Sequence, residues 1–252
     1  MINDIKVAFA FLTRIPIHHK DEISIQRSAV WFPLVGFVIG LSSGILFVGL
    51  NELIPATPAA AITLIFSILV TGGFHQDGLA DSFDGLVGGW NPADRMRILK
   101  DSRHGTYGVL SLVLQLILQF ALLSTLESQI ALLALLTSHT LSRLVPIYFM
   151  LTPAAPSHEG MGATYVRIVK KNHVLFATLL TISLLAPFIG LHLLIISAVV
   201  GIASLFFLLY VRKKIGGVVG DVLGASEQIA ESFILLYFVL ISTNNLWLTW
   251  LI

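Results

Sequence analysis

The stretch "AAAITLIFSILVTGGFHQDGLADSFDGLVGGW", residues 59–90, joins an apolar run to a segment that carries three aspartates. The run 59–76 is predicted to span a membrane, because about 20 consecutive apolar residues cross the hydrocarbon core of a bilayer. Asp77, Asp81 and Asp84 follow at positions i, i+4 and i+7, which share one face of a helix. Three carboxylates on one face repel one another unless protons or cations are bound there.

The composition of the chain indicates a helical integral membrane protein. Of its 252 residues, 56% are apolar and only 12% are charged, and the mean hydropathy is +0.89. Soluble domains carry about a quarter charged residues, and apolar runs that are continuous rather than alternating favour helices over a barrel. The absence of cysteine excludes disulfides, thiolate catalysis and cysteine-ligated metals. With no long linker or repeat, we expect a single membrane domain over residues 1–252.

Seven apolar runs are predicted to span the membrane. They cover residues 30–50, 59–76, 105–125, 129–151, 174–189, 192–211 and 229–251. Pro187 and Gly190 interrupt the stretch 174–211, which is either two short spans or one span with a re-entrant piece. Residues 3–17 are apolar but too short to span, and they form either an amphipathic helix at the membrane surface or a packed N-terminal helix without lipid contact.

The distribution of positive charge predicts the orientation. Fourteen of the 15 lysines and arginines lie before the first predicted span or after the second, fourth and sixth, and the intervening loops have none. By the positive-inside rule, the N-terminus and these loops are cytoplasmic and the C-terminus is outside, which requires an odd number of spans. We therefore expect a multi-pass protein of the cell membrane with its acidic segment on the cytoplasmic side. The fifteenth cation, Arg143, lies within a span, where a charge usually has a carboxylate or phosphate partner.

The acidic segment and the loop after it together predict a metal–pyrophosphate site. Carboxylate oxygens are the ligands that Mg²⁺ prefers, and Asp101 adds a fourth candidate. Arg95, Lys100 and Arg103 are placed to hold phosphate oxygens. In the simpler alternative, the aspartates lie at a solvated helix end and bind no metal, and the arginines and lysine only set the orientation of the chain in the membrane. Acids and cations together on one cytoplasmic face favour the metal site.

Three further polar positions belong to the prediction. His75 is either a general base, a partner of an incoming hydroxyl or a buried structural histidine. Asp221 and Glu231 lie at the same predicted cytoplasmic boundary as the aspartates, so they are candidates to meet them in space. Glu227 shares a helix face with Glu231, at i and i+4.

The motifs resemble those of one known family. The segments "GGFHQDGLADSFDG" (72–85), "DSRHGTYG" (101–108) and "GGVVGDVLGA" (216–225), with "FLTRIP" and "FPLVGFVIG" near the N-terminus, are similar to the signature of adenosylcobinamide-GDP ribazoletransferase, also called cobalamin-5'-phosphate synthase. The resemblance implies a Mg²⁺-dependent membrane enzyme of late cobalamin biosynthesis. Such an enzyme joins adenosylcobinamide-GDP to alpha-ribazole, or to its 5'-phosphate, and releases GMP.

The residues and the resemblance together give a predicted site. Glu227 is left out, because it stands one position out of register with the family pattern. The predicted catalytic residues are His75, Asp77, Asp81 and Arg103; the metal ligands are Asp77, Asp81, Asp84 and Asp101; the substrate-binding residues are Arg95, Lys100, Arg103, Arg143, Asp221 and Glu231. The expected partners are the two substrates and the lipid bilayer, with no nucleic acid and with the oligomeric state open.

Two other functions fit parts of the sequence. A CDP-alcohol phosphotransferase acting on lipid has the same reaction class, but its D-G-x-x-A-R signature is not matched here, because Asp77-Gly78 is followed by Ala80-Asp81 with no arginine at the matching position. A cation-coupled transporter would place its charges near the bilayer midplane in paired broken helices. Here the carboxylates gather at the predicted cytoplasmic ends of the spans instead.

Overall fold

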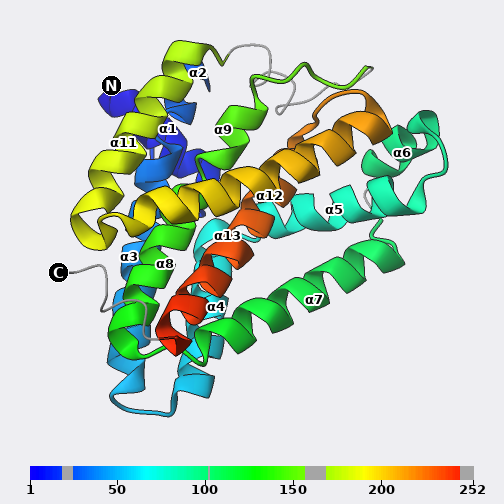
Figure 1. The fold of residues 1–252 in the computed structure, drawn as a ribbon. Helices are drawn as coiled ribbons and strands as arrows, with labels where there is room; N and C mark the ends of the chain where they lie inside the picture. Colours follow the sequence, from blue (N-terminus) through cyan, green and yellow to red (C-terminus); the bar gives the residue numbers. More distant parts are fainter. Residues whose placement is uncertain (19–24, 102, 157–168, 245–252) are drawn as a thin grey trace.

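The computed structural model describes residues 1–18, 25–101, 103–156 and 169–244, and within these ranges the regular elements are helices apart from a single bridge between Ala154 and Val218 (Figure 1). Lys20 and Arg167, two of the cations counted above, lie outside the described residues. The helices are α1 (Ile2–Leu12), α2 (Ile25–Ala29), α3 (Phe32–Asn51), α4 (Ala56–Thr71), α5 (Phe74–Gly88), α6 (Pro92–Leu99), α7 (Thr106–Leu123), α8 (Ser128–Ser142), α9 (Val145–Phe149), α11 (Lys171–Ile189), α12 (His192–Ile215) and α13 (Gly220–Thr243).

The predicted class of fold is confirmed. Among the described residues, six helical segments are long and apolar enough to cross a membrane, and the bent pair α4–α5 would make a seventh. The stretch 174–211 is two such helices, α11 and α12, which separate at Gly190, while Pro187 is accommodated inside α11. Each helix is long and apolar enough to cross a membrane, which favours the alternative of two spans.

The second predicted span is not one continuous helix. It ends at Thr71, and α5 leaves at an angle of 89° from α4. Gly72 and Gly73 form the break with φ of 69° and 67°, a left-handed backbone that glycine adopts without strain from a side chain. The acidic segment therefore forms a separate helix directed away from α4, and the two helices together make either a broken span or a re-entrant loop.

Helix α13 forms the centre of the bundle, with α5, α7, α8 and α12 packed around it (Figure 1). It begins at Gly220, nine residues before the predicted start at 229, and 245–252 lie outside the described residues. The prediction was wrong at this end because Asp221, Glu227 and Glu231 lower the local hydropathy. The structure buries two of these carboxylates, Glu227 and Glu231, against partners inside the bundle.

Helix α7 has its polar side chains on the inside. Gln115 and Gln119 are buried, and they donate to the carbonyl of Gln228 and to Glu231 on α13. The opposite face exposes a row of apolar residues that includes Leu110, Leu114 and Ile117. This arrangement suits a lipid environment, where polar groups must find partners within the protein.

Helices α3 and α8 approach each other closely along a glycine face. A Cβ atom at Gly40 would lie 2.5 Å from the backbone oxygen of Leu135, and one at Gly44 would lie 3.0 Å from the Cα of Leu132. Small residues at four-residue spacing allow such packing between membrane helices. The contact places α8, which carries His139 and Arg143, beside α3.

Helix α1 confirms a short N-terminal helix that ends earlier than the predicted residue 17. It stops at Leu12 because Thr13 is extended and Pro16 follows. Phe11 stacks on Phe32 of α3 and meets the ring of Phe74 at the start of α5. The helix therefore packs against the break between α4 and α5, and the predicted contact with the membrane surface is not tested.

Candidate functional site

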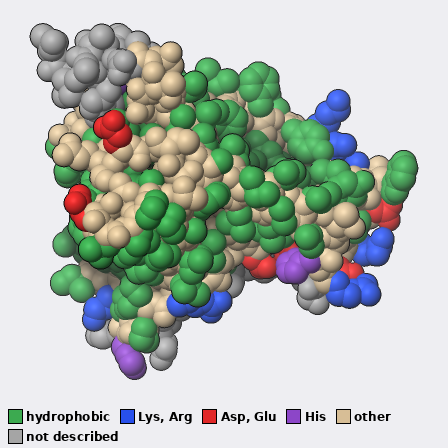
Figure 2. All heavy atoms as spheres, turned by 90° about the horizontal axis from the view of Figure 1, so that it is seen from below, with side chains coloured by type: hydrophobic (Ala, Val, Ile, Leu, Met, Phe, Trp, Pro, Cys, Tyr) green, Lys and Arg blue, Asp and Glu red, His purple; other side chains and the backbone are tan. Residues whose placement is uncertain are grey.

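The exposed end of the molecule near α5 carries two aspartates and a histidine in close proximity. Asp77 and Asp81 lie on successive turns of α5, and His104 reaches them from the loop before α7. The His104 Nδ1 is 3.4 Å from Asp81 Oδ1, and its Nε2 is 3.9 Å from Asp77 Oδ1. One ligand atom from each residue can be chosen so that all lie within 4.8 Å of one another, a spacing that a metal ion can bridge. Figure 2 shows acidic and histidine side chains side by side on a mostly hydrophobic face, with lysine and arginine side chains nearby.

Asp84 has a different environment from its two neighbours on α5. It is buried, and it accepts hydrogen bonds from the backbone N–H groups of Gly105 at 2.6 Å and Gly108 at 2.8 Å. A carboxylate at a helix N-terminus satisfies free N–H groups and complements the helix dipole. Asp84, predicted as a metal ligand, therefore fixes the start of α7 and with it the loop that carries His104.

Asp221 approaches the acidic face from α13. Its backbone oxygen would lie 2.8 Å from a Cβ atom at position 78, so Gly78 is what lets the two helices meet. Asp77 and Asp81 are both close enough to Asp221 to act on its charge. The segment 216–225, which contains Asp221, therefore meets the segment 72–85 in the fold, as predicted.

Asp101 and Arg103 bind each other. The Arg103 Nε is 3.0 Å from Asp101 Oδ1, and its Nη2 is 2.7 Å from Oδ2. The side-chain and backbone hydrogen bonds from Arg103 lower the pKa of Asp101 to about 2. Among the described residues, the structure does not bring Asp101 into the Asp77–Asp81–His104 cluster.

The other two predicted phosphate-binding cations differ in exposure. Arg95 is buried, and its guanidinium donates to the backbone oxygens of Trp90 and Lys214, which ties α6 to the end of α12. Lys100 is exposed at the C-terminal end of α6. Of the two, Lys100 has the exposed side chain.

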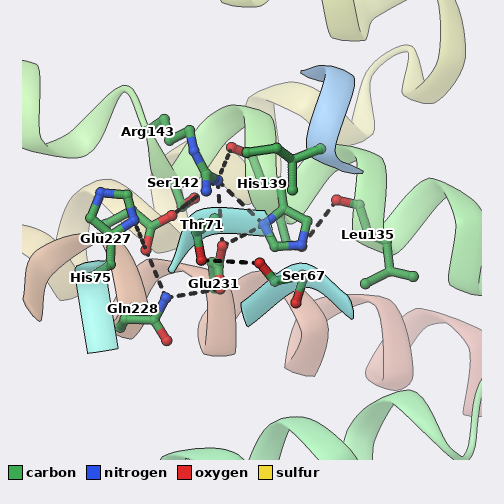
Figure 3. A network of polar contacts seen from close by, with 12 residues as sticks. Ser67, Thr71, His75, Leu135, His139, Ser142, Arg143, Glu227, Gln228 and Glu231 are labelled. Atoms are coloured by element: carbon green, nitrogen blue, oxygen red, sulfur yellow. Dashed lines mark hydrogen bonds and ion pairs between the residues drawn. The ribbon is translucent and has the colours of Figure 1, made fainter. Parts of the chain in front are cut away.

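A second group of charged residues is buried between α8 and α13 (Figure 3). The Arg143 Nη1 lies 3.0 Å from Glu227 Oε1 and 3.5 Å from Glu231 Oε1. His139 Nδ1 is 2.6 Å from Glu231 Oε1. Arg143 and Glu231, both predicted to bind substrate, therefore hold each other inside the bundle. Arg143 has carboxylate partners, as the alternative prediction required, but they are glutamates of α13 and not the aspartates of α5.

His75 belongs to this buried network. Its Nδ1 is 3.3 Å from Glu227 Oε2, and Gln228 donates to the same oxygen at 2.8 Å. Successive residues of a helix turn by about 100°, so His75 and the exposed Asp77 leave α5 in different directions. The structure thus places His75 beside Glu227 and not in the cluster around Asp77.

Three titratable residues of these clusters, His104, His139 and Glu227, were absent from the predicted site. His104 had no signal in the sequence. A single histidine in a loop has no fixed spacing to Asp81 and Asp77, which lie 23 and 27 positions earlier in the chain. Glu227 did give a signal, its i, i+4 relation to Glu231, and that relation proved to be a shared contact with Arg143.

Comparison with known proteins identifies the family. The model of the family described as cobalamin-5-phosphate synthase matches residues 4–239. A protein of Shewanella baltica named adenosylcobinamide-GDP ribazoletransferase is 36% identical over 260 residues, which cover 95% of this chain and 94% of that protein. A protein of Shewanella oneidensis with the same name is 36% identical over 261 residues, with the same coverage. No solved structure matches. Since both kinds of match extend over nearly the whole chain, the chain belongs to the cobalamin-5-phosphate synthase family, and it is a transferase of cobalamin synthesis.

Proposed function

We propose that this transferase joins adenosylcobinamide-GDP to alpha-ribazole, or to alpha-ribazole 5'-phosphate, and releases GMP in a Mg²⁺-dependent reaction. The name shared by the Shewanella relatives, adenosylcobinamide-GDP ribazoletransferase, supports the donor and the class of acceptor. The observation that carries the proposal is the cluster of Asp77, Asp81 and His104, with Asp221 beside it. It lies on the exposed face of α5, where a large water-soluble donor can reach it.

The donor atoms of this cluster fit a hard divalent cation. Asp77 and Asp81 offer carboxylate oxygens on successive turns, which is the chemistry that Mg²⁺ prefers. The loop that carries His104 lies close against Asp84 of the same helix. Gly105 allows this approach, because a Cβ atom at position 105 would lie 2.5 Å from Asp84 Oδ1. When bound, Mg²⁺ supplies positive charge that neutralises the oxygens of the diphosphate.

The reaction breaks the bond between the bridging oxygen and the phosphorus that carries cobinamide. A ribose hydroxyl of the acceptor forms the new bond to this phosphorus, and GMP leaves with the bridging oxygen and its electron pair. The 5' oxygen is not the nucleophile, because one of the two acceptors already carries a phosphate there. We assign the hydroxyl proton to a carboxylate on the exposed face of α5, since His75 is buried and faces Glu227.

The chain's cations have separate parts in this proposal. Arg103 and Lys100 are exposed near the site and supply charge to the phosphates of the donor. Arg143 and Glu231 position α8 and α13 from within, and Arg95 holds α6. The positive-inside pattern supports a site on the cytoplasmic face of the cell membrane.

The test uses the full-length protein purified in detergent. GMP is measured after addition of adenosylcobinamide-GDP with alpha-ribazole, with and without Mg²⁺, and with the acceptor omitted. We expect GMP release that requires the acceptor and Mg²⁺, and its loss in Asp81→Asn at unchanged thermal stability. Turnover of CDP-diacylglycerol without turnover of the corrinoid would contradict the proposal, as would near-normal activity of Asp81→Asn.

A further inference from the structure

We propose that His104 is a protein ligand of the divalent ion bound by Asp77 and Asp81, and that its imidazole makes this site favour first-row transition ions such as Mn²⁺ and Co²⁺ over Mg²⁺. The inference rests on the metal site of the proposed function and adds a residue and a selectivity to it. The sequence motifs assign no role to this histidine.

The distances within the cluster leave room for a shared ion. Charge-assisted N–H···O bonds are about 2.7–2.9 Å long, and the buried pair of His139 and Glu231 is that close, at 2.6 Å. The His104 Nδ1 is 3.4 Å from Asp81 Oδ1, and the other ring nitrogen, Nε2, is 3.9 Å from Asp77 Oδ1. An imidazole gives one of these nitrogens to an ion. Two neighbouring ligands of an octahedral ion at about 2.1 Å from each lie about 3 Å apart. One ligand atom from each of the three residues can be chosen so that all lie within 4.8 Å of one another, which is wider than such a coordination shell, and a bound ion would draw these atoms together.

The position of His104 is fixed by its neighbour in the chain. Gly105 donates its N–H to Asp84 at 2.6 Å, and Gly108 donates to the other oxygen of the same carboxylate. Asp84 lies one turn after Asp81 on α5, so one helix carries both the anchor of the loop and the carboxylates that His104 faces. The imidazole is therefore held over the acidic face by a bond that is independent of any ion.

The cluster is also accessible to an ion and to substrate. The side chains of His104 and Asp77 are 46% and 66% exposed, while Asp81 is 21% exposed. An open site of two carboxylates and one imidazole differs from a site of oxygen ligands alone in the metal ions that it binds most tightly. Imidazole binds transition ions better than it binds Mg²⁺, whereas carboxylates accept both. His104 is thus the residue that decides between these two classes of ion.

The direct test is a spin-echo measurement on Mn²⁺ bound to the full-length protein in detergent. We expect a modulation from an imidazole nitrogen in the wild type, which disappears in His104→Leu and in the polar variant His104→Gln while Mn²⁺ remains bound. His18→Leu, which removes an exposed histidine elsewhere, should keep the modulation. Asp77→Asn with Asp81→Asn should abolish Mn²⁺ binding at the same concentrations. Wild-type Mn²⁺ without nitrogen modulation, or modulation that persists in both His104 variants, would overturn the proposal.

The selectivity is measured by competition. The concentration of Mg²⁺ that displaces half of the bound Mn²⁺ should fall about tenfold in both His104 variants, because they lose a ligand that favours Mn²⁺. Equal displacement in the wild type and the variants would count against the selectivity. These readouts are independent of turnover. Nitrogen modulation without GMP release would overturn the proposed reaction alone, and Mg²⁺-dependent GMP release without nitrogen modulation would overturn this inference alone.

Discussion

Arg143 is the buried residue on which two carboxylates depend. In Arg143→Met, Glu227 and Glu231 would lose the guanidinium that lies 3.0 and 3.5 Å from them. Removal of one partner from a buried ion pair costs about 3–5 kcal/mol, so we expect a large fall in the thermal unfolding midpoint in detergent. Arg97→Met, at an exposed position, should leave the midpoint unchanged. The double variant Arg143→Met with Glu227→Gln should recover part of the loss, and equal midpoints for the two single variants would contradict this role.

Arg103 offers a test of how phosphate is held. Its planar guanidinium forms two bonds to Asp101, and these bonds lower the pKa of Asp101 to about 2. Lysine cannot reproduce the paired donors. We expect Arg103→Lys to lower kcat/KM for the donor at least tenfold and Lys100→Arg to change it less than threefold. Equal and small changes of kcat/KM in the two variants would mean that both cations only set the orientation of the chain in the membrane and do not bind phosphate.

At the scale of elements, the contact between α3 and α8 is the one that a single methyl group should disturb. In Gly40→Ala the new Cβ would lie 2.5 Å from the backbone oxygen of Leu135, which cannot rotate away. Overpacking of this kind costs about 1–3 kcal/mol. Gly49→Ala is the matched control on the same helix, because a Cβ there meets nothing within 4 Å. Unfolding in detergent should show a lower midpoint for Gly40→Ala only, and a fall of equal size in both would refute the close approach.

For the whole molecule, the predicted orientation is open to a direct measurement. The chain has no cysteine, so single cysteines can be introduced without a background. Leu53, between α3 and α4, is 81% exposed, and Trp90, between α5 and α6, is 91% exposed. A membrane-impermeant thiol reagent added to intact cells should label Leu53→Cys and not Trp90→Cys, with both labelled after lysis. Labelling of Trp90→Cys in intact cells would reverse the orientation and place the site outside.

The sequence by itself determined the class of this protein, its membrane helices and the motifs of its site. Hydropathy and the position of charges are local properties, so composition was enough to indicate the spans. The i, i+4, i+7 spacing of Asp77, Asp81 and Asp84 was also local, and the structure keeps all three on one helix.

Tertiary structure decided which of these residues act together. The turn of 89° after Thr71, the anchoring of Gly105 by Asp84 and the arrival of His104 over the acidic face join segments about 20 residues apart. The pairing of Arg143 with Glu227 joins residues on two helices far apart in the chain. Such contacts depend on how helices pack, and packing depends on the shapes of two surfaces at once. Local hydropathy and charge describe each surface separately, and this is why they could indicate the helices but not the partners.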